Sequence, residues 1–402
     1  MSVLVIGGSV AGIAVADGLR SQGYQGAVTV VDADPSLPYD KPPLSKHALK
    51  EDWDPIKGLL RPEEHYAAKD IELVTGRTAV ALDAVRRTVR FDDGSERQAD
   101  HVVLATGVRA RLLPEELMLP GVHAIRTAAD SAAVRAALAD RPRLVVIGGG
   151  FIGAEAASVA AGMGLEVTIV EALPLPFQHL FGADVAEAMA GWHRAAGVRL
   201  ECGVMVAGIE GAERVERVRL TDGRVLEVDL VLLGLGAVPA VDWLDGSGLD
   251  LDNGITCDED GRTGLPGIWA AGDAATWRNP VTGDHVRVEH WTTAKEQGAA
   301  VAHNIARPDE PARGAGPVPY FWSDQHGLRV QFLGTSAGHD ATHLVHGSFD
   351  EPEFVVLYAR EGRIIGALGV AAARHVMKYR TAISAGERIE GLLDPVGEAA
   401  GA

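Results

Sequence analysis

Two glycine-rich hexapeptides lie where an apolar strand is expected to turn into a helix. Each follows four β-favouring residues and precedes a run of small residues. Backbone N–H groups with no Cβ in the way, together with the positive end of a helix dipole, suit a pyrophosphate. Two such units in one chain therefore predict two dinucleotide-binding sites. The predicted cofactor-binding positions in these turns are Gly7, Gly8, Ser9, Val10, Ala11, Gly12, Gly148, Gly149, Gly150, Phe151, Ile152 and Gly153.

A second apolar strand that ends in an acid follows each turn. The sequence VTVVD ends at Asp32, and VTIVE ends at Glu171. A carboxylate at this point accepts hydrogen bonds from ribose hydroxyls and repels a 2′-phosphate. No arginine follows Glu171 over residues 172–174, so the second site is predicted to prefer NADH to NADPH. In the first copy Asp32 fits best by strand position, and Asp34 is the alternative.

Composition narrows the class of protein. The chain has 402 residues, 37 Lys+Arg and 55 Asp+Glu, and its net charge of −18 argues against nucleic-acid or anionic-membrane binding. Its 2 cysteines, Cys202 and Cys257, form no C-x-x-C motif. The longest uncharged stretch, residues 1–16, is too short for a membrane span and lacks the basic start of a signal peptide. We expect a cytoplasmic α/β protein with two to three domains.

The last quarter of the chain follows a different pattern. Residues 307–319 are rich in Gly, Pro and Arg, which is typical of a linker. Short strand-like runs and one helix are expected beyond it, so residues 318–402 predict a small α+β domain. The expected strands are Arg329–Leu333, Phe354–Tyr358 and Ile364–Ala367, and the expected helix is Ala371–Ala385.

Two side-chain groups in this region could have a function. His339, His343 and His346 lie close together in the sequence, but no acid or thiolate cluster adjoins them. We therefore expect an exposed turn and strand there and no metal site. A basic stretch on the expected helix is either a solvated face or a docking patch for an acidic protein. Its residues are Arg374, His375, Lys378 and Arg380.

Two further signatures surround the second glycine-rich turn. They are Ala105-Thr106-Gly107 and the run ending in Gly272-Asp273. In this setting the sequence resembles the flavoproteins that have two dinucleotide-binding domains, with an FAD domain interrupted by an NAD domain. The resemblance implies an α/β fold with two Rossmann-like domains and a small C-terminal α+β domain. The implied boundaries are 1–110 and 236–313 for the FAD-binding domain, 111–235 for the NAD-binding domain and 318–402 for the C-terminal reductase domain.

Three longer segments sharpen the resemblance. Residues 38–46, 289–298 and 319–325 are similar to segments of the NADH-dependent ferredoxin and rubredoxin reductases. The similarity covers essentially the whole chain and is greatest to the reductases of oxygenase systems. It implies an enzyme that passes electrons from NADH through FAD to a two-iron ferredoxin, which serves a cytochrome P450 or a ring-hydroxylating dioxygenase.

The resemblance also implies roles for single residues. Lys46 would lie near N5 of the flavin as a catalytic residue. Glu155 would pair with Lys46 or hold the nicotinamide carboxamide. Two positions depart from the family pattern, because Lys41 replaces an arginine and Ala240 replaces an asparagine. In many relatives the acid that binds the ribose occupies the position that is Ala33 in this sequence. The remaining implied cofactor-binding positions are Ala33, Lys41, Ala79, Ala105, Thr106, Gly107, Arg126, Gly234, Gly236, Gly272, Asp273, His290 and Trp291.

Other functions within and outside this enzyme class stay open. A related flavoprotein could use rubredoxin, monodehydroascorbate, quinone or oxygen as acceptor. A disulfide reductase is disfavoured because residues 35–50 contain no cysteine. Related NADH oxidases and coenzyme A disulfide reductases carry their cysteine in this region. The alternative from another class is a redox-sensing interaction protein of the apoptosis-inducing-factor type. Relatives of that type carry long C-terminal insertions, which this sequence lacks.

Overall fold

The computed structural model describes residues 1–50, 52–279 and 283–393. They cluster in two compact units, between which the chain passes repeatedly. Unit 1 comprises Met1–Pro42, Asp54–Arg109 and Ala237–Pro317, and unit 2 comprises Pro43–Trp53, Ala110–Gly236 and the chain from Val318 onward. The sequence-based division into four segments stays a prediction, and the end of its last segment lies outside the described residues. In the structure the short segment that holds Lys46 clusters with unit 2.

A five-stranded parallel sheet in the order β19-β7-β1-β2-β3 is the core of unit 1. The strands are β1 Ser2–Ile6, β2 Ala27–Val31, β3 Ile71–Val74, β7 His101–Leu104 and β19 Ile268–Ala270. The central strands are almost continuously apolar and buried, which suits a sheet covered on both faces. The helix α1 (Val10–Ser21) packs against α7 (Trp291–Ala306). Small residues allow this approach, because a Cβ on Gly298 would lie 2.4 Å from the carbonyl oxygen of Ala11.

Two three-stranded sheets and short elements complete unit 1. One sheet has the order β4-β5-β6 and the other β18-β20-β21. Their bounds are β4 Ala79–Asp83, β5 Thr88–Phe91, β6 Glu96–Gln98, β18 Ile255–Cys257, β20 Ala275–Arg278 and β21 His285–Arg287. The short elements are α2 Glu63–Ala68, β8 Val108–Ala110 and β17 Ala237–Pro239.

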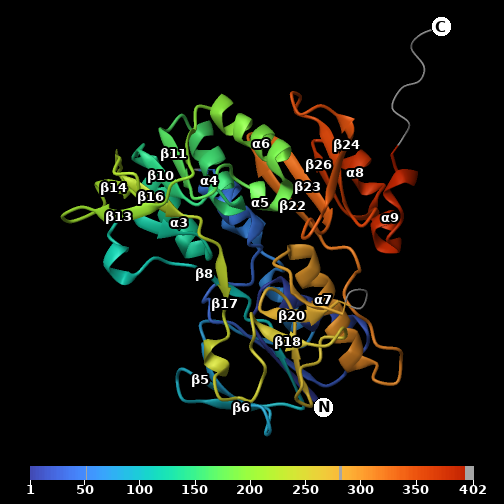
Figure 1. The fold of residues 1–402 in the computed structure, drawn as a ribbon. Coiled ribbons are helices and arrows are strands. Elements are labelled where there is room, and N and C mark those ends of the chain that lie inside the picture. The colour runs from blue at the N-terminus through green and yellow to red at the C-terminus, as the bar shows by residue number, and fades with distance from the viewer. Residues whose placement is uncertain (51, 280–282, 394–402) are drawn as a thin grey trace. The chain divides into compact units, whose positions relative to one another are not determined.

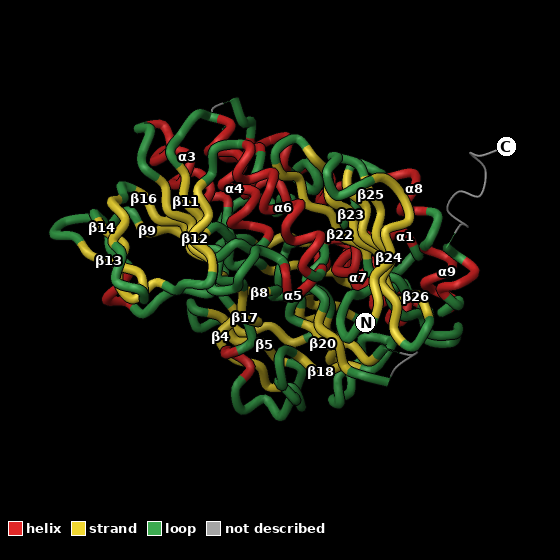
Figure 2. Tube along the Cα trace, turned by 45° about the horizontal axis from the view of Figure 1, so that its top comes forward, coloured by secondary structure: helices red, strands yellow, loops and turns green. Residues whose placement is uncertain are grey.

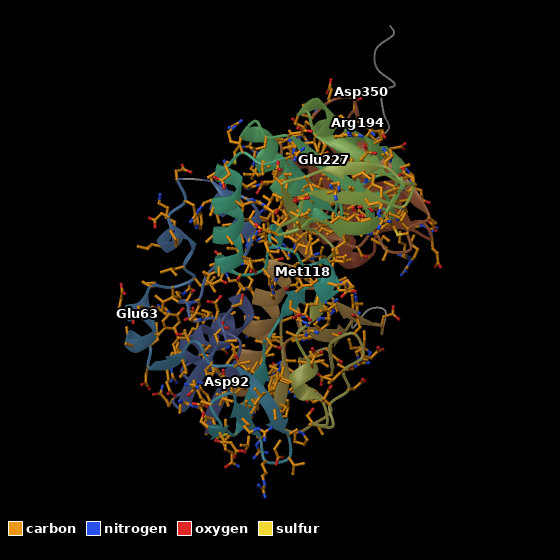
Figure 3. All side chains as sticks on the ribbon, turned by 90° about the vertical axis from the view of Figure 1, so that its left-hand side faces the viewer. Glu63, Asp92, Met118, Arg194, Glu227 and Asp350 are labelled. Atoms are coloured by element: carbon orange, nitrogen blue, oxygen red, sulfur yellow. The ribbon has the colours of Figure 1, made fainter. Side chains whose placement is uncertain are left out.

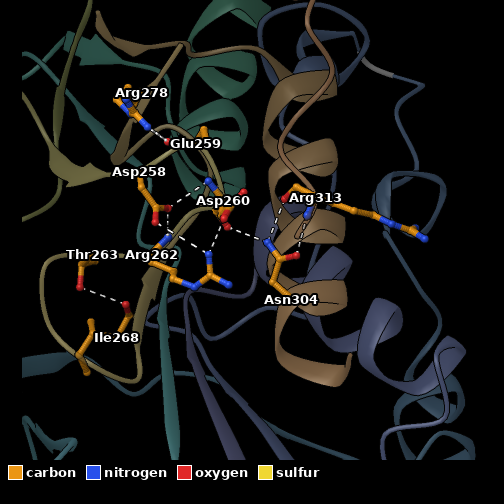
Figure 4. Close-up of polar contacts among 9 residues, drawn as sticks. All are labelled: Asp258, Glu259, Asp260, Arg262, Thr263, Ile268, Arg278, Asn304 and Arg313. Carbon is orange, nitrogen blue, oxygen red and sulfur yellow. Dashed lines mark hydrogen bonds and ion pairs between the residues drawn. The ribbon is translucent and has the colours of Figure 1, made fainter. Parts of the chain in front are cut away.

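Polar contacts hold the loop after β18 and the linker against α7 (Figure 4). Asn304 on α7 donates from its amide nitrogen to the carbonyl oxygens of Asp260 and Arg313, both at 2.9 Å. Its amide oxygen accepts from the backbone N–H of Arg313 at 2.8 Å. The Gly/Pro/Arg-rich segment that was expected to be a linker is therefore held on unit 1 as far as Arg313.

Unit 2 has its own parallel sheet, in the order β12-β11-β10-β16-β9. Its strands are β9 Val122–Ala124, β10 Leu144–Ile147, β11 Val167–Glu171, β12 Arg199–Cys202 and β16 Leu230–Leu233. Figure 2 shows these strands side by side with α3 and α4 next to them. The helices are α3 Ala128–Ala139, α4 Phe151–Gly162, α5 Gln178–Phe181 and α6 Ala183–Ala195. A three-stranded antiparallel sheet adjoins it and contains β13 Val206–Glu210, β14 Arg217–Leu220 and β15 Val225–Glu227.

The C-terminal part of unit 2 is a five-stranded antiparallel sheet in the order β22-β23-β26-β25-β24. Its strands are β22 Tyr320–Gln325, β23 Leu328–Gly334, β24 Ala341–Gly347, β25 Phe354–Arg360 and β26 Arg363–Val370. Aromatic side chains join this sheet to α4, α5 and α6, and the ring centroids of Phe151 and Phe321 are 4.9 Å apart. In Figure 1 α5 and α6 lie beside β22 and β23.

The three strands expected here are present, but the expected helix is wrong as a single element. Two short helices, α8 (Ala373–Met377) and α9 (Arg380–Ala385), replace it. They separate at Tyr379, which is buried and whose N–H donates to the carbonyl of Val376 three residues back. This three-residue hydrogen bond interrupts the four-residue pattern of an α-helix.

Charged side chains cover the surfaces of both units. Glu63 and Asp92 are exposed in unit 1, as Glu227 and Asp350 are in unit 2 (Figure 3). Among the described residues, no helix has both the length and the apolar character that a membrane crossing requires.

Candidate functional site

The first glycine-rich turn joins β1 to α1 in unit 1. Gly7 has a φ of +110°, and a Cβ there would lie 2.2 Å from the carbonyl oxygen of Ala105. Only glycine fits this position. Ser9, which departs from the glycine pattern, has a φ of −85° and a ψ of −168°. Gly150, at the same place in the second copy, has a φ of −72° and a ψ of 180°. This backbone suits any residue, so Ser9 leaves the shape of the turn unchanged.

Asp32 closes the first turn. Its Oδ2 accepts from the backbone N–H of Gly8 at 2.7 Å, and its Oδ1 accepts from the N–H of Asp34 at 3.1 Å. The carboxylate of Asp34 instead accepts from the hydroxyl of Tyr39 at 2.6 Å and from the N–H of Ser36 at 2.9 Å. Burial acts to raise the pKa of Asp34, but these hydrogen bonds outweigh it and lower the pKa. The structure therefore favours Asp32 over Asp34 as the acid of this turn.

The second turn, in unit 2, repeats this arrangement. Gly148 has a φ of +99°, and a Cβ there would lie 2.4 Å from the carbonyl oxygen of Gly234. Glu171 at the end of β11 accepts from the N–H of Gly149 at 2.8 Å and from the N–H of Leu173 at 2.9 Å. Each carboxylate oxygen keeps a further lone pair for a ribose hydroxyl. The two glycine turns thus have the same geometry and each has its own acid.

Several other predicted positions of unit 1 lie around the carboxyl ends of the sheet strands. Ala105, Thr106 and Gly107 follow β7, and the hydroxyl of Thr106 donates to the carbonyl of Ala240 at 2.9 Å. Gly272 and Asp273 follow β19, and Gln297, which is buried, accepts from the N–H of Gly272 at 2.8 Å. Ligands of open α/β sheets bind outside the carboxyl ends of the strands. These segments therefore fit a dinucleotide that begins at the first glycine turn.

Trp291 and His290 lie at the N-terminus of α7. The indole Nε1 of Trp291 donates to Oδ1 of Asp40 at 2.8 Å, which ties α7 to the segment 38–42. Burial lowers the pKa of His290 to about 4. Lys41 in the same segment places its Nζ 4.8 Å from the centre of the Tyr39 ring. Ala79 begins β4.

A buried ion pair is the most distinctive feature of unit 2. Nζ of Lys46 lies 3.1 Å from Oε1 of Glu155 and 3.5 Å from Oδ2 of Asp324. The side chains of Lys46 and Glu155 are only 10% and 5% exposed. A charge this far from water must have partners. Glu155 belongs to the first turns of α4, so the pair lies beside the second glycine-rich turn.

Two serines complete the shell around Glu155. The hydroxyl of Ser45 donates to Oε2 at 2.5 Å, and the hydroxyl of Ser323 donates to Oε1 at 2.6 Å. Burial raises the pKa of Glu155, whereas Lys46 and the two serines act to lower it. Both serines are themselves almost fully buried.

Neighbouring helices hold the segment that carries Lys46. The hydroxyl of Ser131 on α3 donates to the carbonyl of Leu44 at 2.8 Å. The guanidinium of Arg135 donates to the carbonyl of Ala48 at 3.3 Å. Nζ of Lys46 also lies 5.8 Å from the centre of the Trp322 ring on β22. Lys46 is therefore fixed from α3, α4 and the C-terminal sheet at once.

The other predicted positions of unit 2 are more scattered. Arg126 precedes α3, and its N–H donates to the carboxylate of Asp130 at 3.0 Å. Gly234 and Gly236 follow β16, and the N–H of Gly234 donates to the carbonyl of Ile147 at 2.7 Å. Gly234 thus lies against the second glycine turn.

Sequence reasoning missed Ser45, Ser323 and Asp324 as members of the site. They come from segments far apart in the chain and meet only around Lys46 and Glu155. A usable signal was the expected pairing of Glu155 with Lys46, because a paired carboxylate still has lone pairs for hydrogen-bond donors. The two family-like segments 38–46 and 319–325 contain those donors.

Comparisons with known proteins identify the family of the chain. Residues 1–298 match the family described as pyridine nucleotide-disulphide oxidoreductase, and residues 320–394 match the reductase C-terminal family. Rhodocoxin reductase of Rhodococcus erythropolis is 36% identical over 94% of this chain and 88% of its own. The ferredoxin reductase of the CYP199A2 system of Rhodopseudomonas palustris is 33% identical with a TM-score of 0.93, covering 98% and 97% of the two chains.

A third similar protein is a reductase that was solved in a covalent complex with another protein. The covalent putidaredoxin reductase–putidaredoxin complex contains a chain that is 31% identical, with a TM-score of 0.93 over 98% of this chain and 96% of that one. Matches of this length extend across both units and the C-terminal sheet. The chain therefore belongs to the flavin- and nicotinamide-binding pyridine nucleotide-disulphide oxidoreductase family, and within it to the ferredoxin reductases that carry the reductase C-terminal domain.

Proposed function

We propose that this protein is an NADH:ferredoxin reductase that passes electrons from NADH through FAD to a two-iron ferredoxin of an oxygenase system. The observation that carries the proposal is the pair of equivalent glycine turns, each closed by a carboxylate, at Asp32 and at Glu171. Two dinucleotide sites in one chain suit an enzyme that joins two nucleotide cofactors. Relatives named as reductases of P450 and dioxygenase systems support the choice of acceptor.

FAD is assigned to unit 1 and NADH to the second glycine turn. The turn from Gly7 to Gly12 leads into the N-terminus of α1, whose positive end suits a pyrophosphate, and Asp32 suits the ribose. Asp273 and the segment 105–107 suit the rest of the same nucleotide. A bound flavin supplies the ability to take two electrons as a hydride and release them singly.

Lys46 and Glu155 are the proposed catalytic residues. Stabilisation of negative charge on a bound flavin is what a buried ammonium group such as that of Lys46 would supply. Glu155, held by Ser45 and Ser323, holds the ammonium group of Lys46 in one place. No protein nucleophile is required. We also propose a cytoplasmic location.

Cofactor preference gives a first prediction. In Glu171→Gln, one amide oxygen must replace two carboxylate oxygens that now accept from Gly149 and Leu173. Losing hydrogen bonds to a charged group costs about 1.5–3 kcal/mol. We therefore expect kcat/KM for NADH to fall about tenfold or more, while kcat/KM for NADPH falls less or rises. The check is the ratio of kcat/KM values for the two nucleotides.

The control is Glu187→Gln, which changes an exposed acid on α6 that pairs with Arg194. It should leave that ratio as it is in the wild type. If the ratio is also unaltered in Glu171→Gln, Glu171 does not bind the ribose and the assignment is wrong.

A visible spectrum and an acceptor assay test the proposed function directly. The purified protein should be yellow, or become so when FAD is added, and NADH should bleach it. Cytochrome c reduction by NADH should then depend on an added two-iron ferredoxin. Rubredoxin in its place tests the alternative acceptor. A folded protein that stays colourless with added FAD would refute the proposal.

The basic stretch in the C-terminal part supplies another prediction. Arg374 and Lys378 are exposed, whereas Arg380 is half-buried and donates to the carbonyl of Val318 at 3.5 Å. In a protein of net charge −18, a local positive surface can steer an acidic ferredoxin. Reversing both charges, Arg374→Glu with Lys378→Glu, should raise the KM for ferredoxin several-fold and leave the reaction with NADH unchanged. Ferricyanide reduction by NADH is expected to continue at the wild-type rate.

Arg86→Glu is the matched control, since Arg86 is exposed in the turn after β4. It should leave the KM for ferredoxin unchanged. Equal losses with ferredoxin and with ferricyanide in the double variant would indicate misfolding and not docking.

A further inference from the structure

Three side chains that could ligate a metal ion lie close together at the C-terminal sheet. None of them belongs to the cluster around Lys46 and Glu155. His346 belongs to β24, Glu353 immediately precedes β25, and His375 belongs to α8. One ligand atom from each lies within 4.8 Å of those of the other two. The sequence drew attention to His346 only in the run with His339 and His343, where no metal site was expected. The fold separates His346 from that run and brings it to two different partners.

A local irregularity in β24 explains how His346 reaches these partners. The pairing of β24 with β25 shifts register between Leu344 and His346. A bulge of this kind re-aims the side chain that follows it. Val345 and His346 are consequently both half-buried, whereas Leu344 is exposed. Val345 packs on the same apolar cluster as Val376 of α8, so this part of β24 faces α8.

The three ligand side chains are near neighbours. Nε2 of His346 lies 3.1 Å from Oε1 of Glu353. The rings of His346 and His375 are stacked with centroids 3.9 Å apart and planes 13° from parallel. Imidazole lone pairs lie in the ring plane, so those of stacked rings run parallel and do not meet at one ion. Two bonds of about 2.1 Å at a tetrahedral angle require nitrogens about 3.4 Å apart with converging lone pairs, which the exposed His375 reaches by turning its ring out of the stack.

We propose that His346, Glu353 and His375 bind a divalent late transition-metal ion, for which Zn²⁺ is the biological candidate. Two imidazoles and one carboxylate are a typical ligand set for zinc, with water in the fourth position. Ca²⁺ and Mg²⁺ prefer oxygen ligands throughout. The exposed Arg374 next to His375 opposes a cation, and the carboxylate of Glu353 offsets it. The ion would join the β24–β25 hairpin to α8, a structural role beyond the proposed electron transfer.

The test is Zn²⁺ binding by the full chain with its flavin, after treatment with a chelator. Isothermal titration with zinc chloride should show one saturable site per chain, and Zn²⁺ should raise the Tm. His375→Ala, His346→Ala and Glu353→Gln should each weaken binding at least about tenfold, since even changes around metal ligands cost that much. Each should also abolish the zinc-dependent rise in Tm.

His343→Ala is the matched control. His343 lies on the same strand, half-buried, and is outside the cluster of three ligands. Its variant should bind Zn²⁺ as the wild type does. The proposal is wrong if the wild type takes up no stoichiometric Zn²⁺, or if the three ligand variants bind it as tightly as His343→Ala. A cooperative thermal transition near the wild-type Tm in the absence of Zn²⁺ would show that each variant folds.

Discussion

Replacing Lys46 with methionine will slow the reduction of the bound flavin by NADH by about 100-fold, the order of effect seen when one positioned charge or donor is removed from an active site. Methionine keeps most of the length of the side chain and removes only the charge. The pair partner Glu155 stays buried with its two serines. Anaerobic stopped-flow at the flavin absorbance measures this step without ferredoxin.

The same variant will change how stability depends on pH. Burial already raises the pKa of Glu155 above 4.5, and losing Lys46 removes the largest influence that lowers it. A carboxyl group with a raised folded-state pKa contributes stability that is complete below the unfolded pKa and is lost as pH rises through the folded pKa. In Lys46→Met that loss extends to higher pH. The difference in Tm from the wild type should therefore be small at pH 5 and grow toward pH 8.

The loss of folding stability in Lys46→Met should reach at most about 3–5 kcal/mol, which is the cost of leaving a buried charge without its partner. Lys50→Met is the control, because Lys50 lies in the same segment and is exposed. It should match the wild type in both the rate and the pH dependence of Tm. Wild-type flavin reduction in Lys46→Met would refute the assigned role of Lys46, whatever happens to stability.

The second large effect is expected at the second glycine turn. In Gly148→Ala the new Cβ would lie 2.4 Å from the carbonyl oxygen of Gly234, at a φ of +99°. A non-glycine residue in such a conformation costs about 1–3 kcal/mol before the steric overlap is added. The turn must move, and the N–H groups that would face the pyrophosphate of NADH move with it. We expect the KM for NADH to rise about 100-fold or more, which corresponds to about 2.7 kcal/mol.

Gly150→Ser is the matched control in the same turn. A Cβ at Gly150 would find its nearest atom 3.8 Å away, and the backbone there is extended. The variant reproduces Ser9 of the first copy, so it should bind NADH nearly as the wild type does. Flavin content reports on unit 1 and should be normal in both variants. Equal NADH affinity in Gly148→Ala and Gly150→Ser would show that this turn does not bind the nucleotide.

Some structural features were readable because their causes are local in sequence. Each glycine turn has a positive φ at its first residue, and a glycine directly after an apolar strand already indicates it. The strands around the turns are continuous apolar runs. Residues 371–385 were misread as one helix because the break at Tyr379, whose ring is buried in the apolar cluster of the C-terminal sheet, has no local sequence pattern.

The sequence by itself indicated two glycine-rich turns, each followed by a candidate acid, and the family that they resemble. The choice of Asp32 over Asp34 needed the structure. Only the tertiary structure decided that Lys46 meets Glu155 and Asp324, and that His346 meets Glu353 and His375. Turns and apolar strands follow from backbone preferences over a few residues. The side-chain clusters depend on packing between segments more than a hundred residues apart, or on a bulge that turns one histidine, and no local pattern records either.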